Sequence, residues 1–461
     1  MESDNKKIVS RRGFLKSVIA GSTVVAATAV GCDSPKKEKQ VIQEVPTGKM
    51  TYRLNNKGEK ISILGYGCMR LPMVSKDGTN DGEKVIDQEM VNRHVDYAIE
   101  HGVNYFDTSP AYCKGKSEQA MGIALSRHDR NKYYIATKLS NFAKSTWSYS
   151  ESVKMYHKSF TELQVDYIDY MLLHGIGMGG MGNMKARYLD NGVLDFLLKE
   201  REKGKIKNLG FSYHGDVECF DYLLARHDVY KWDFVQIQLN YIDWKHAVRD
   251  ANAEYLYNEL EKRNIPVVIM EPLRGGALAS LNHTALAMLK RADSDLTAAS
   301  WAFRFAGTPK GILTVLSGMT YMEHLQENIR TYSPLVPLTA VENEMMERVA
   351  NMILKYPLIG CTSCQYCMPC PYGLDIPGIF AHYNKCINEG NFSDSINDEN
   401  FAEARRVFLI GYDRSVPRLR QADHCVGCRK CEEHCPQQIP IASKMRVIDE
   451  YVENLRRNNN I

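Results

Sequence analysis

Two groups of closely spaced cysteines carry the clearest chemical information in this chain of 461 residues. The downstream group reads Cys-x2-Cys-x2-Cys-x3-Cys-Pro, and the upstream group differs in having x2 before its last cysteine. Thiolates at this spacing can converge on one [4Fe–4S] cluster, so the sequence predicts two [4Fe–4S] clusters and electron transfer. The eight predicted ligands are Cys361, Cys364, Cys367, Cys370, Cys425, Cys428, Cys431 and Cys435.

Other uses of these cysteines stay open at this point. Pairs of Cys-x2-Cys also form four-cysteine zinc sites, and cysteines of exported proteins can form disulfides. Where two [4Fe–4S] clusters share such runs, the fourth cysteine of one run ligates the other cluster. We therefore expect Cys435 to complete the upstream set and Cys370 to complete the downstream set.

Polar residues at the ends of apolar, strand-like segments form a second candidate site. Asp107 closes the second segment, Lys138 and His174 follow the third and fourth, Ser212 follows the fifth, and Gln236 lies in the sixth. A charged residue at one strand end can merely terminate the strand. A carboxylate, an amine and an imidazole on three successive strands are stronger evidence, because the carboxyl ends of barrel strands meet at one face, where active sites lie.

The elements that must position these residues alternate between apolar runs and amphipathic helical stretches, from about residue 52 to 335. This alternation predicts an α/β fold, a (β/α)8 TIM barrel. The expected strands are 63–69, 104–107, 133–137, 167–173, 206–211, 234–239, 267–270 and 312–316. The expected helices are 89–101, 117–126, 153–163, 194–203, 216–225 and 254–262.

An open doubly wound sheet is the alternative to the barrel. Its support is the glycine pattern Gly175-x-Gly177-x-x-Gly180 after a strand. Because Gly182 and Asn183 follow, we expect a flexible loop there and no helix. Beyond the barrel, the sequence predicts helices at 341–356, 379–389 and 399–410, so the cysteine runs belong to a smaller, mainly helical ferredoxin-like domain.

The motifs of residues 50–335 resemble those of the aldo-keto reductase family. Residues 104–112 read NYFDTSPAY and are similar to the family's Asp-Thr-x3-Tyr loop, followed in order by ATK at 136–138 and LLH at 172–174. A branch of this family carries a C-terminal ferredoxin-like domain, and this chain resembles that branch. The resemblance implies a catalytic set of Asp107, Tyr112, Lys138 and His174.

Carbonyl reduction needs a hydride at carbon and a proton at oxygen, and the resemblance makes Tyr112 the general acid. A free Tyr has a pKa of about 10. A Lys138 ammonium about 4 Å away would contribute up to ~4 kcal/mol at an effective dielectric near 20, which lowers that pKa by as much as roughly three units. Asp107 would hold Lys138 in its charged form, and His174 would orient the carbonyl oxygen.

The resemblance also implies a nicotinamide cofactor, NAD(H) or NADP(H). Its expected contacts are Ser212, Gln236, Glu327 and Asn328. Where NADP-selective relatives place Lys, Ser and Arg around the 2′-phosphate, this chain has Gly318, Met319 and His324. Glycine and methionine cannot pair with a dianion, so we expect NAD(H) to be slightly favoured.

The N-terminus predicts export. Residues 10–16 read SRRGFLK and precede a short apolar stretch, which is typical of a twin-arginine signal. Cys32 follows Ala-Val-Gly as in a lipoprotein processing site, and the alternatives are plain cleavage or an uncleaved anchor. We expect a periplasmic protein or a membrane-anchored lipoprotein attached through Cys32, and a cytoplasmic one if the signal is not used.

The whole chain divides into five predicted segments. They are a signal at 1–32, a polar linker at 33–49, the barrel at 50–335, a linking helix at 336–356 and the iron–sulfur domain at 357–461. Hydrophobic residues make up 44% and charged residues 25%, as in an ordinary globular protein, and the net charge of +3 gives no nucleic-acid footprint.

The leading interpretation is an oxidoreductase that couples nicotinamide-dependent carbonyl or alcohol chemistry to iron–sulfur electron transfer. Its partners would be a small carbonyl or alcohol substrate and a redox partner at the membrane, with membrane contact only through the signal or lipid anchor. The alternative is an exported electron-transfer module whose barrel binds a partner or another redox ligand without nicotinamide turnover. A regulatory barrel is a third interpretation, and the intact catalytic set argues against it.

Overall fold

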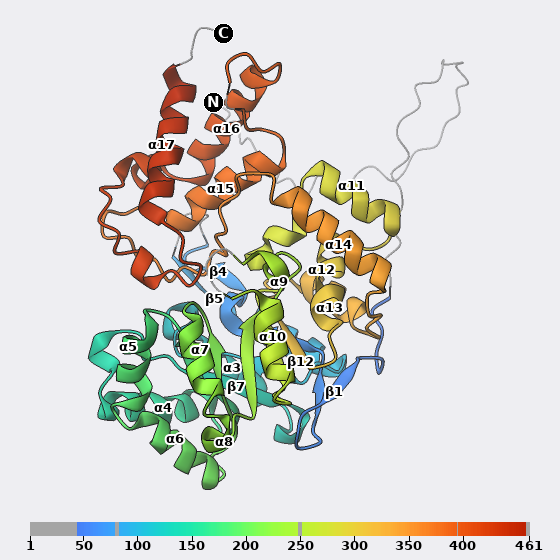
Figure 1. Cartoon of the computed structure of the whole chain (residues 1–461), viewed down its shortest axis with the longest axis vertical. Coiled ribbons are helices and arrows are strands. Elements are labelled where there is room, and N and C mark those ends of the chain that lie inside the picture. Colours follow the sequence, from blue (N-terminus) through green and yellow to red (C-terminus); the bar gives the residue numbers. More distant parts are fainter. Residues whose placement is uncertain (1–43, 79–82, 248–250, 394, 458–461) are drawn as a thin grey trace, which may run out of the picture. The chain divides into compact units, whose positions relative to one another are not determined.

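Eight parallel strands form a closed barrel in the computed structural model of the chain (Figure 1). The strands are β3 (Leu64–Gly67), β6 (Tyr105–Asp107), β7 (Tyr134–Leu139), β8 (Ile168–Ile176), β9 (Ile206–Tyr213), β10 (Phe234–Gln238), β11 (Val267–Met270) and β12 (Ile312–Ser317). They close in the order β10-β11-β12-β3-β6-β7-β8-β9. The predicted TIM barrel is therefore confirmed, and the open doubly wound sheet is excluded. The structure describes residues 44–78, 83–247, 251–393 and 395–457.

The strands were readable in the sequence because they are buried on both faces. All nine residues of β8 are buried, as are all four of β11 and all six of β12. Parallel strands covered by helices on the outside read as continuous apolar runs. Two short antiparallel hairpins lie outside the barrel, β1 (Tyr52–Leu54) with β2 (Lys60–Ser62) and β4 (Met73–Ser75) with β5 (Lys84–Ile86).

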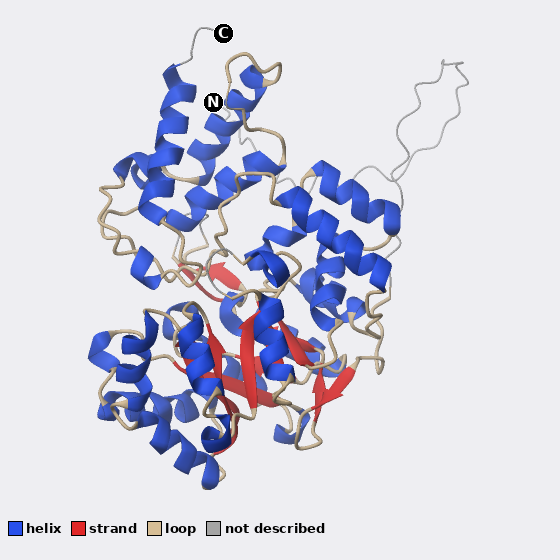
Figure 2. Ribbon diagram, in the orientation of Figure 1, coloured by secondary structure: helices blue, strands red, loops and turns tan. Residues whose placement is uncertain are grey.

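Helices surround the strands (Figure 2). The helices that follow barrel strands or lie near them are α2 (Gln88–Glu100), α3 (Ser117–Leu125), α4 (Tyr149–Leu163), α6 (Val193–Glu202), α7 (Val217–Leu224), α8 (His227–Tyr230), α9 (Asp243–His246), α10 (Ala253–Glu261), α11 (His283–Ala292), α12 (Ala298–Gly307) and α13 (Met322–Thr331). Side chains cap several of them: Asp87 accepts from the Met90 N–H and Thr297 from the Ser300 N–H. Such caps satisfy backbone donors that a helix start leaves unpaired.

The expectation of a flexible loop at the glycine pattern was wrong. Strand β8 continues to Ile176, and a short helix, α5 (Gly180–Met184), starts at Gly180 and runs into a π-helical turn over Lys185–Leu189. Gly177 and Gly180 take positive φ values of 94° and 75°, which turn the chain. Tertiary packing then overrides the low helix propensity of this segment, because Met184, Arg187 and Tyr188 are buried beneath it.

The C-terminal region is helical, as expected. Its helices are α14 (Ala340–Ile353), α15 (Ile376–Asn388), α16 (Phe401–Ser415) and α17 (Ile441–Arg457), of which α17 was not predicted. The last three build a core of their own around Phe380, Phe408 and Met445, with the cysteine runs packed against it. Residues 45–461 cluster into one compact unit.

The predictions for the N-terminus lie outside the described residues and stay predictions. They concern the signal at 1–32, Cys32 and most of the linker. Among the helices that the structure describes, none combines the length and the apolar character needed to cross a membrane.

Candidate functional site

The barrel brings the four predicted catalytic residues together at the carboxyl ends of β6, β7 and β8. The Lys138 ammonium donates to Asp107 Oδ1 at 2.5 Å and to the Thr108 carbonyl at 2.8 Å. The same nitrogen lies 4.8 Å from the centre of the Tyr112 ring. The rings of Tyr112 and His174 are 6.0 Å apart and nearly perpendicular. All four side chains are buried; Tyr112, the most open, is 8% exposed.

The turn that carries Tyr112 is strained. Cys113 and Lys114, the next two residues, take left-handed φ values of 49° and 54° although neither is glycine. Such conformations cost of order 1–3 kcal/mol each and cluster at active sites. Ser109 supports the turn by accepting a hydrogen bond from the Ala111 N–H at 3.0 Å. The backbone is thus held in the conformation that points Tyr112 at His174.

The predicted lowering of the Tyr112 pKa was wrong for this arrangement. Burial raises the pKa of Tyr112 well above its usual value, and the Tyr366 phenol and the Asp107 carboxylate raise it further. The main cause is burial of the phenol, and Lys138 does not act as an isolated charge that would offset it. Its ammonium is bonded to Asp107, so the phenol faces a nearly neutral ion pair and not a free cation.

His174 is a neutral imidazole in this site. Burial lowers its pKa well below the usual value, and the nearby cations Lys138 and Arg187 lower it further. Its Nδ1 lies 2.6 Å from the Ser140 hydroxyl. When Nδ1 accepts that hydroxyl's hydrogen, Nε2 carries the proton of the neutral ring and can donate to a carbonyl oxygen.

Two of the four predicted nicotinamide contacts are neighbours. Gln236 on β10 is the register partner of Ser212 on β9. The Gln236 side-chain oxygen is buried with no hydrogen-bond partner among the described residues, while the Ser212 hydroxyl accepts from the Gly175 N–H at 2.9 Å. An orphaned amide oxygen fits the carboxamide N–H of a nicotinamide ring, because a buried acceptor is costly unless paired.

The other two predicted contacts lie on α13, apart from this pair. The Asn328 amide donates to the Ser317 hydroxyl at 3.0 Å, and the Glu327 carboxylate accepts from the Thr297 hydroxyl. Gly318 leaves room for the Arg70 side chain, which packs against it. Arg70 thus brings a cationic side chain to Gly318, with its guanidinium bonded to the Thr362 carbonyl, while Met319 is buried.

Four of the predicted cluster ligands line one small cavity, Cys361, Cys364 and Cys367 from the upstream run and Cys435 from the downstream run. Burial, with a smaller contribution from the neighbouring thiols, raises the pKa of Cys364 and of Cys367 to about 12. Buried thiols that repel one another as thiolates fit a cationic iron–sulfur core, which would stabilise the ionised form.

The remaining ligands form a second, more exposed group. Burial raises the pKa of Cys431 to about 11, and Cys425 and Cys370 contribute in the same direction, so these three lie near one another. Cys428 is exposed. Within the described segments, no three or more His, Cys, Asp or Glu side chains are arranged tightly enough to hold a metal ion.

Sequence reasoning missed two residues that cover the catalytic set. Phe142, after β7, places its ring 4.7 Å from that of His174. Tyr366, from the upstream cysteine run, places its ring 5.7 Å from that of Phe142. The only sequence clue to Tyr366 was its position between two predicted ligands, Cys364 and Cys367. Phe142 had no clue beyond following Lys138 by four residues.

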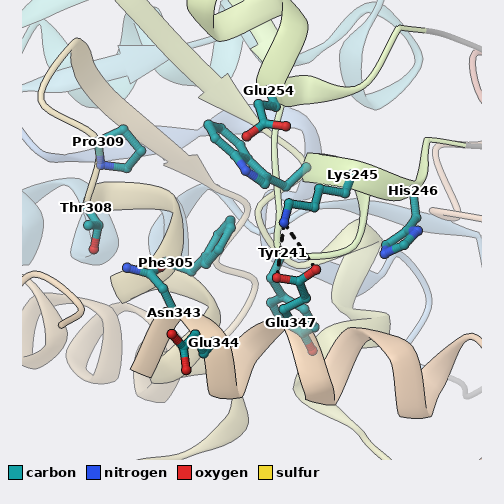
Figure 3. A pocket seen from close by; sticks show the side chains of 11 residues that line it. Tyr241, Lys245, His246, Glu254, Phe305, Thr308, Pro309, Asn343, Glu344 and Glu347 are labelled. Carbon is teal, nitrogen blue, oxygen red and sulfur yellow. Dashed lines mark hydrogen bonds and ion pairs between the residues drawn. The ribbon is translucent and has the colours of Figure 1, made fainter. Parts of the chain in front are cut away.

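A cavity of about 350 Å³ lies elsewhere, away from these residues (Figure 3). Tyr241, Trp244 and Phe305 contribute its aromatic lining. An ion pair between Lys245 on α9 and Glu347 on α14 lies at its edge, at 3.1 Å. None of the predicted catalytic, nicotinamide or cluster residues lines it, so its size does not make it the catalytic site.

Comparisons with known proteins agree with this geometry. The chain is 26% identical over 316 residues to L-galactose dehydrogenase of Arabidopsis thaliana, which covers 65% of this chain and 93% of that protein. It is 33% identical over 127 residues to D-arabinose 1-dehydrogenase of Saccharomyces cerevisiae, covering 26% of this chain and 35% of that protein. The aldo-keto reductase AKR11C1 from Bacillus halodurans, in its holo form, superposes with a TM-score of 0.52 at 22% identity, covering 65% of this chain and 96% of that one; this likeness shows the fold.

Two family profiles match the chain in succession. The 4Fe-4S dicluster domain matches residues 360–440. The aldo/keto reductase family matches residues 64–351, more than half of the chain. The chain therefore belongs to the aldo/keto reductase family of oxidoreductases, with a 4Fe-4S dicluster domain attached at its C-terminal side.

Proposed function

We propose that this protein interconverts a small carbonyl compound and its alcohol with a nicotinamide nucleotide, and that its iron–sulfur clusters exchange electrons with the same site. The observation that carries the proposal is the convergence of Tyr112, His174 and Lys138 with Tyr366, a residue of the upstream cysteine run. One location thus holds the groups for carbonyl chemistry and a segment of the electron-transfer domain.

The residues of the chain have distinct tasks in this proposal. Tyr112 remains protonated at neutral pH, because burial raises its pKa, and it gives its proton to the carbonyl oxygen. His174 donates a hydrogen bond to that oxygen and orients it. The ion pair of Lys138 and Asp107 packs beneath the Tyr112 ring and holds it in place. The unpaired side-chain oxygen of Gln236 would hold the carboxamide of a nicotinamide nucleotide, and that nucleotide would supply the hydride when bound.

The eight cysteines would hold two [4Fe–4S] clusters, in the two groups described above. Clusters of this kind supply or accept electrons one at a time. We propose that the cavity lined by Cys435 and the upstream cysteines holds the cluster near the catalytic residues, and that the group with the exposed Cys428 faces an external redox partner.

Anaerobic stopped-flow mixing of the as-purified protein with NADH, and separately with NADPH, tests the coupling. We expect the visible absorbance of the clusters to bleach with one or both nucleotides, and NADH to be the better reductant. In Gln236→Leu, whose clusters are intact, bleaching should need a higher nucleotide concentration, by the same factor as the loss of nucleotide affinity. Nucleotide binding without bleaching would contradict the coupling, and turnover without bleaching would leave a nicotinamide enzyme with unconnected clusters.

A second candidate function has its own support. The backbone of Thr362 packs on Gly275 so closely that a Cβ at Gly275 would overlap it, and Arg70 donates to the Thr362 carbonyl. Thr362 thus packs against residues that follow β3 and β11 at the carboxyl ends of the barrel strands. In this alternative the barrel binds another redox ligand without nicotinamide turnover. Equilibrium titration with both nucleotides distinguishes the two, because the alternative expects no binding.

We also propose that the protein is exported by the twin-arginine route and is periplasmic or tethered to a membrane through Cys32, where it would meet its redox partner. The support is the sequence pattern at residues 10–32. Cell fractionation of the native protein and of an Arg11→Lys, Arg12→Lys variant tests this. A variant that remains in the exported fraction would contradict it.

A further inference from the structure

The loop between the upstream cysteines reaches from the iron–sulfur domain to the mouth of the barrel. Two of its residues, Ser363 and Gln365, take left-handed φ values of 51° and 65° although neither is glycine. The two turns flank Cys364. The thiols of Cys364 and Cys367 line the cluster cavity, while the Tyr366 side chain points to Phe142 of the barrel. Left-handed turns at non-glycine residues persist only where the surroundings fix them.

Contacts on both sides of this loop fix it to the barrel. Arg70, after β3, donates to the Thr362 carbonyl. Gly275, after β11, lies against the Thr362 backbone where no side chain would fit. Farther along, Gln238 and Gln437 form a reciprocal pair of amide hydrogen bonds at 3.3 and 3.0 Å. The position of Tyr366 is therefore set by the barrel as well as by the cysteines.

Tyr366 covers the catalytic residues from above. Its ring contacts Phe142, whose ring contacts His174, at 5.7 and 4.7 Å between centres. Its phenol is the group that most raises the Tyr112 pKa after burial itself. Tyr112 is only 8% exposed and Tyr366 lies among the groups near its phenol, so a molecule bound at that phenol would lie close to Tyr366.

We propose that Tyr366 is a specificity-determining residue of the reaction, contributed to the catalytic site by the cluster-binding loop. The inference rests on the proposed function, in which the carbonyl lies at Tyr112 and His174. The substituent on the carbonyl carbon then lies against the aromatic faces of Phe142 and Tyr366. Such faces favour planar, aromatic carbonyl compounds over flexible aliphatic ones of similar size, because stacked ring pairs gain energy beyond their area.

The placement also ties substrate recognition to cluster assembly. Cys364 and Tyr366 are two residues apart, so their Cα atoms lie within about 7 Å of each other whatever the loop conformation. The ligand that holds the cluster and the side chain that covers the site therefore move together. Loss of the upstream cluster should release Tyr366 and alter substrate binding even where no electron is transferred.

The test compares holoprotein variants on two probes, 4-nitrobenzaldehyde and hexanal. The variants are Tyr366→Leu, Tyr366→Phe and, as a matched control near the other cysteine group, Tyr372→Leu, whose residue is 50% exposed. We expect Tyr366→Leu to lower the ratio of kcat/KM for the aromatic over the aliphatic aldehyde by about 3- to 12-fold, mainly through KM. Tyr366→Phe and Tyr372→Leu should keep the wild-type ratio.

A second readout does not depend on turnover. The EPR spectrum of the dithionite-reduced wild-type protein should change when benzyl alcohol is added, and that change should be absent in Tyr366→Leu. If Tyr366→Leu fails to retain iron, Gly275→Ala displaces the same loop without altering a ligand and replaces it in both assays.

The outcomes separate the inference from the proposed function. An unchanged aldehyde ratio together with an unchanged EPR response in Tyr366→Leu overturns the inference. An EPR response that depends on Tyr366, in a protein that turns over neither aldehyde, keeps Tyr366 at the binding site and refutes the proposed activity. An absence of both turnover and EPR response in the wild type overturns both.

Discussion

The pH dependence of carbonyl reduction tests how Lys138 acts on Tyr112. An isolated ammonium 4.8 Å from the phenol ring would contribute about 3.5 kcal/mol at an effective dielectric near 20. That energy corresponds to about 2.5 pKa units, which would bring the pKa of Tyr112 from ~10 to about 7.5. The structure instead pairs that ammonium with Asp107 at 2.5 Å, and burial raises the pKa of Tyr112.

The protonated fraction of Tyr112 differs most between these two pKa values above pH 9. Reduction needs the protonated phenol, so activity is lost as the pH rises through the pKa of Tyr112. With a pKa of about 7.5, only about 1% of the phenol would remain protonated at pH 9.5. With the pKa well above 10, nearly all of it would. The groups facing the phenol are Lys138, Asp107, Cys68, Glu271 and Tyr366.

The assay is kcat/KM for 4-nitrobenzaldehyde from pH 6.5 to 10 at constant ionic strength. We expect a flat profile, because His174 is neutral throughout this range and Tyr112 keeps its proton. Tyr112→Phe should lower the whole profile by a factor on the order of 10²–10⁴. Tyr149→Phe, at an exposed site, should leave it unchanged. An alkaline limb near pH 7.5 that disappears in Tyr112→Phe would refute the ion-pair argument.

Three further predictions concern the cluster ligands, the nucleotide site and the buried ion pair. Cys435→Ser and Cys361→Ser should abolish the same cluster signal in EPR, because both residues line one cavity; loss of different signals would contradict the shared site. Gln236→Leu should weaken NADH binding by about 2- to 12-fold in a fluorescence titration, the cost of one hydrogen bond, and unchanged affinity would remove this residue from the nucleotide site. Asp107→Leu should lower the free energy of unfolding by about 3–5 kcal/mol in denaturant titrations, because Lys138 loses its buried partner, and a wild-type midpoint would argue against a charged pair.

The sequence was sufficient for the barrel and for bringing together three of the four residues predicted to be catalytic. Strands buried on both faces appear as apolar runs, and residues at their carboxyl ends meet at one face in any closed parallel barrel. The sequence alone could therefore predict that Asp107, Lys138 and His174 lie together. Strand β8 ran three residues beyond its expected end, to Ile176, because glycines that weaken a strand locally are tolerated there.

The sequence was insufficient where a pKa, a contact or a helix depends on residues that are distant in the chain. The direction of the Tyr112 pKa shift depends first on burial of the phenol and then on the groups around it, and only the structure shows that burial and that Lys138 donates to Asp107 and to the Thr108 carbonyl. The contact between Tyr366 and Phe142 joins segments more than 200 residues apart, which no local pattern encodes. The helix α5 forms against glycine propensity because its buried residues outweigh that propensity.

The placement of Tyr366 limits what the clusters can be for. A domain that served only to pass electrons between external partners would gain nothing from covering Tyr112 and His174 with its own ligand loop. Several local features favour this position of the loop. They are the strained turns at Ser363 and Gln365 and the glycine at position 275, against which the Thr362 backbone packs. The chemistry of the barrel and the state of the upstream cysteines should therefore change together in any variant that moves this loop.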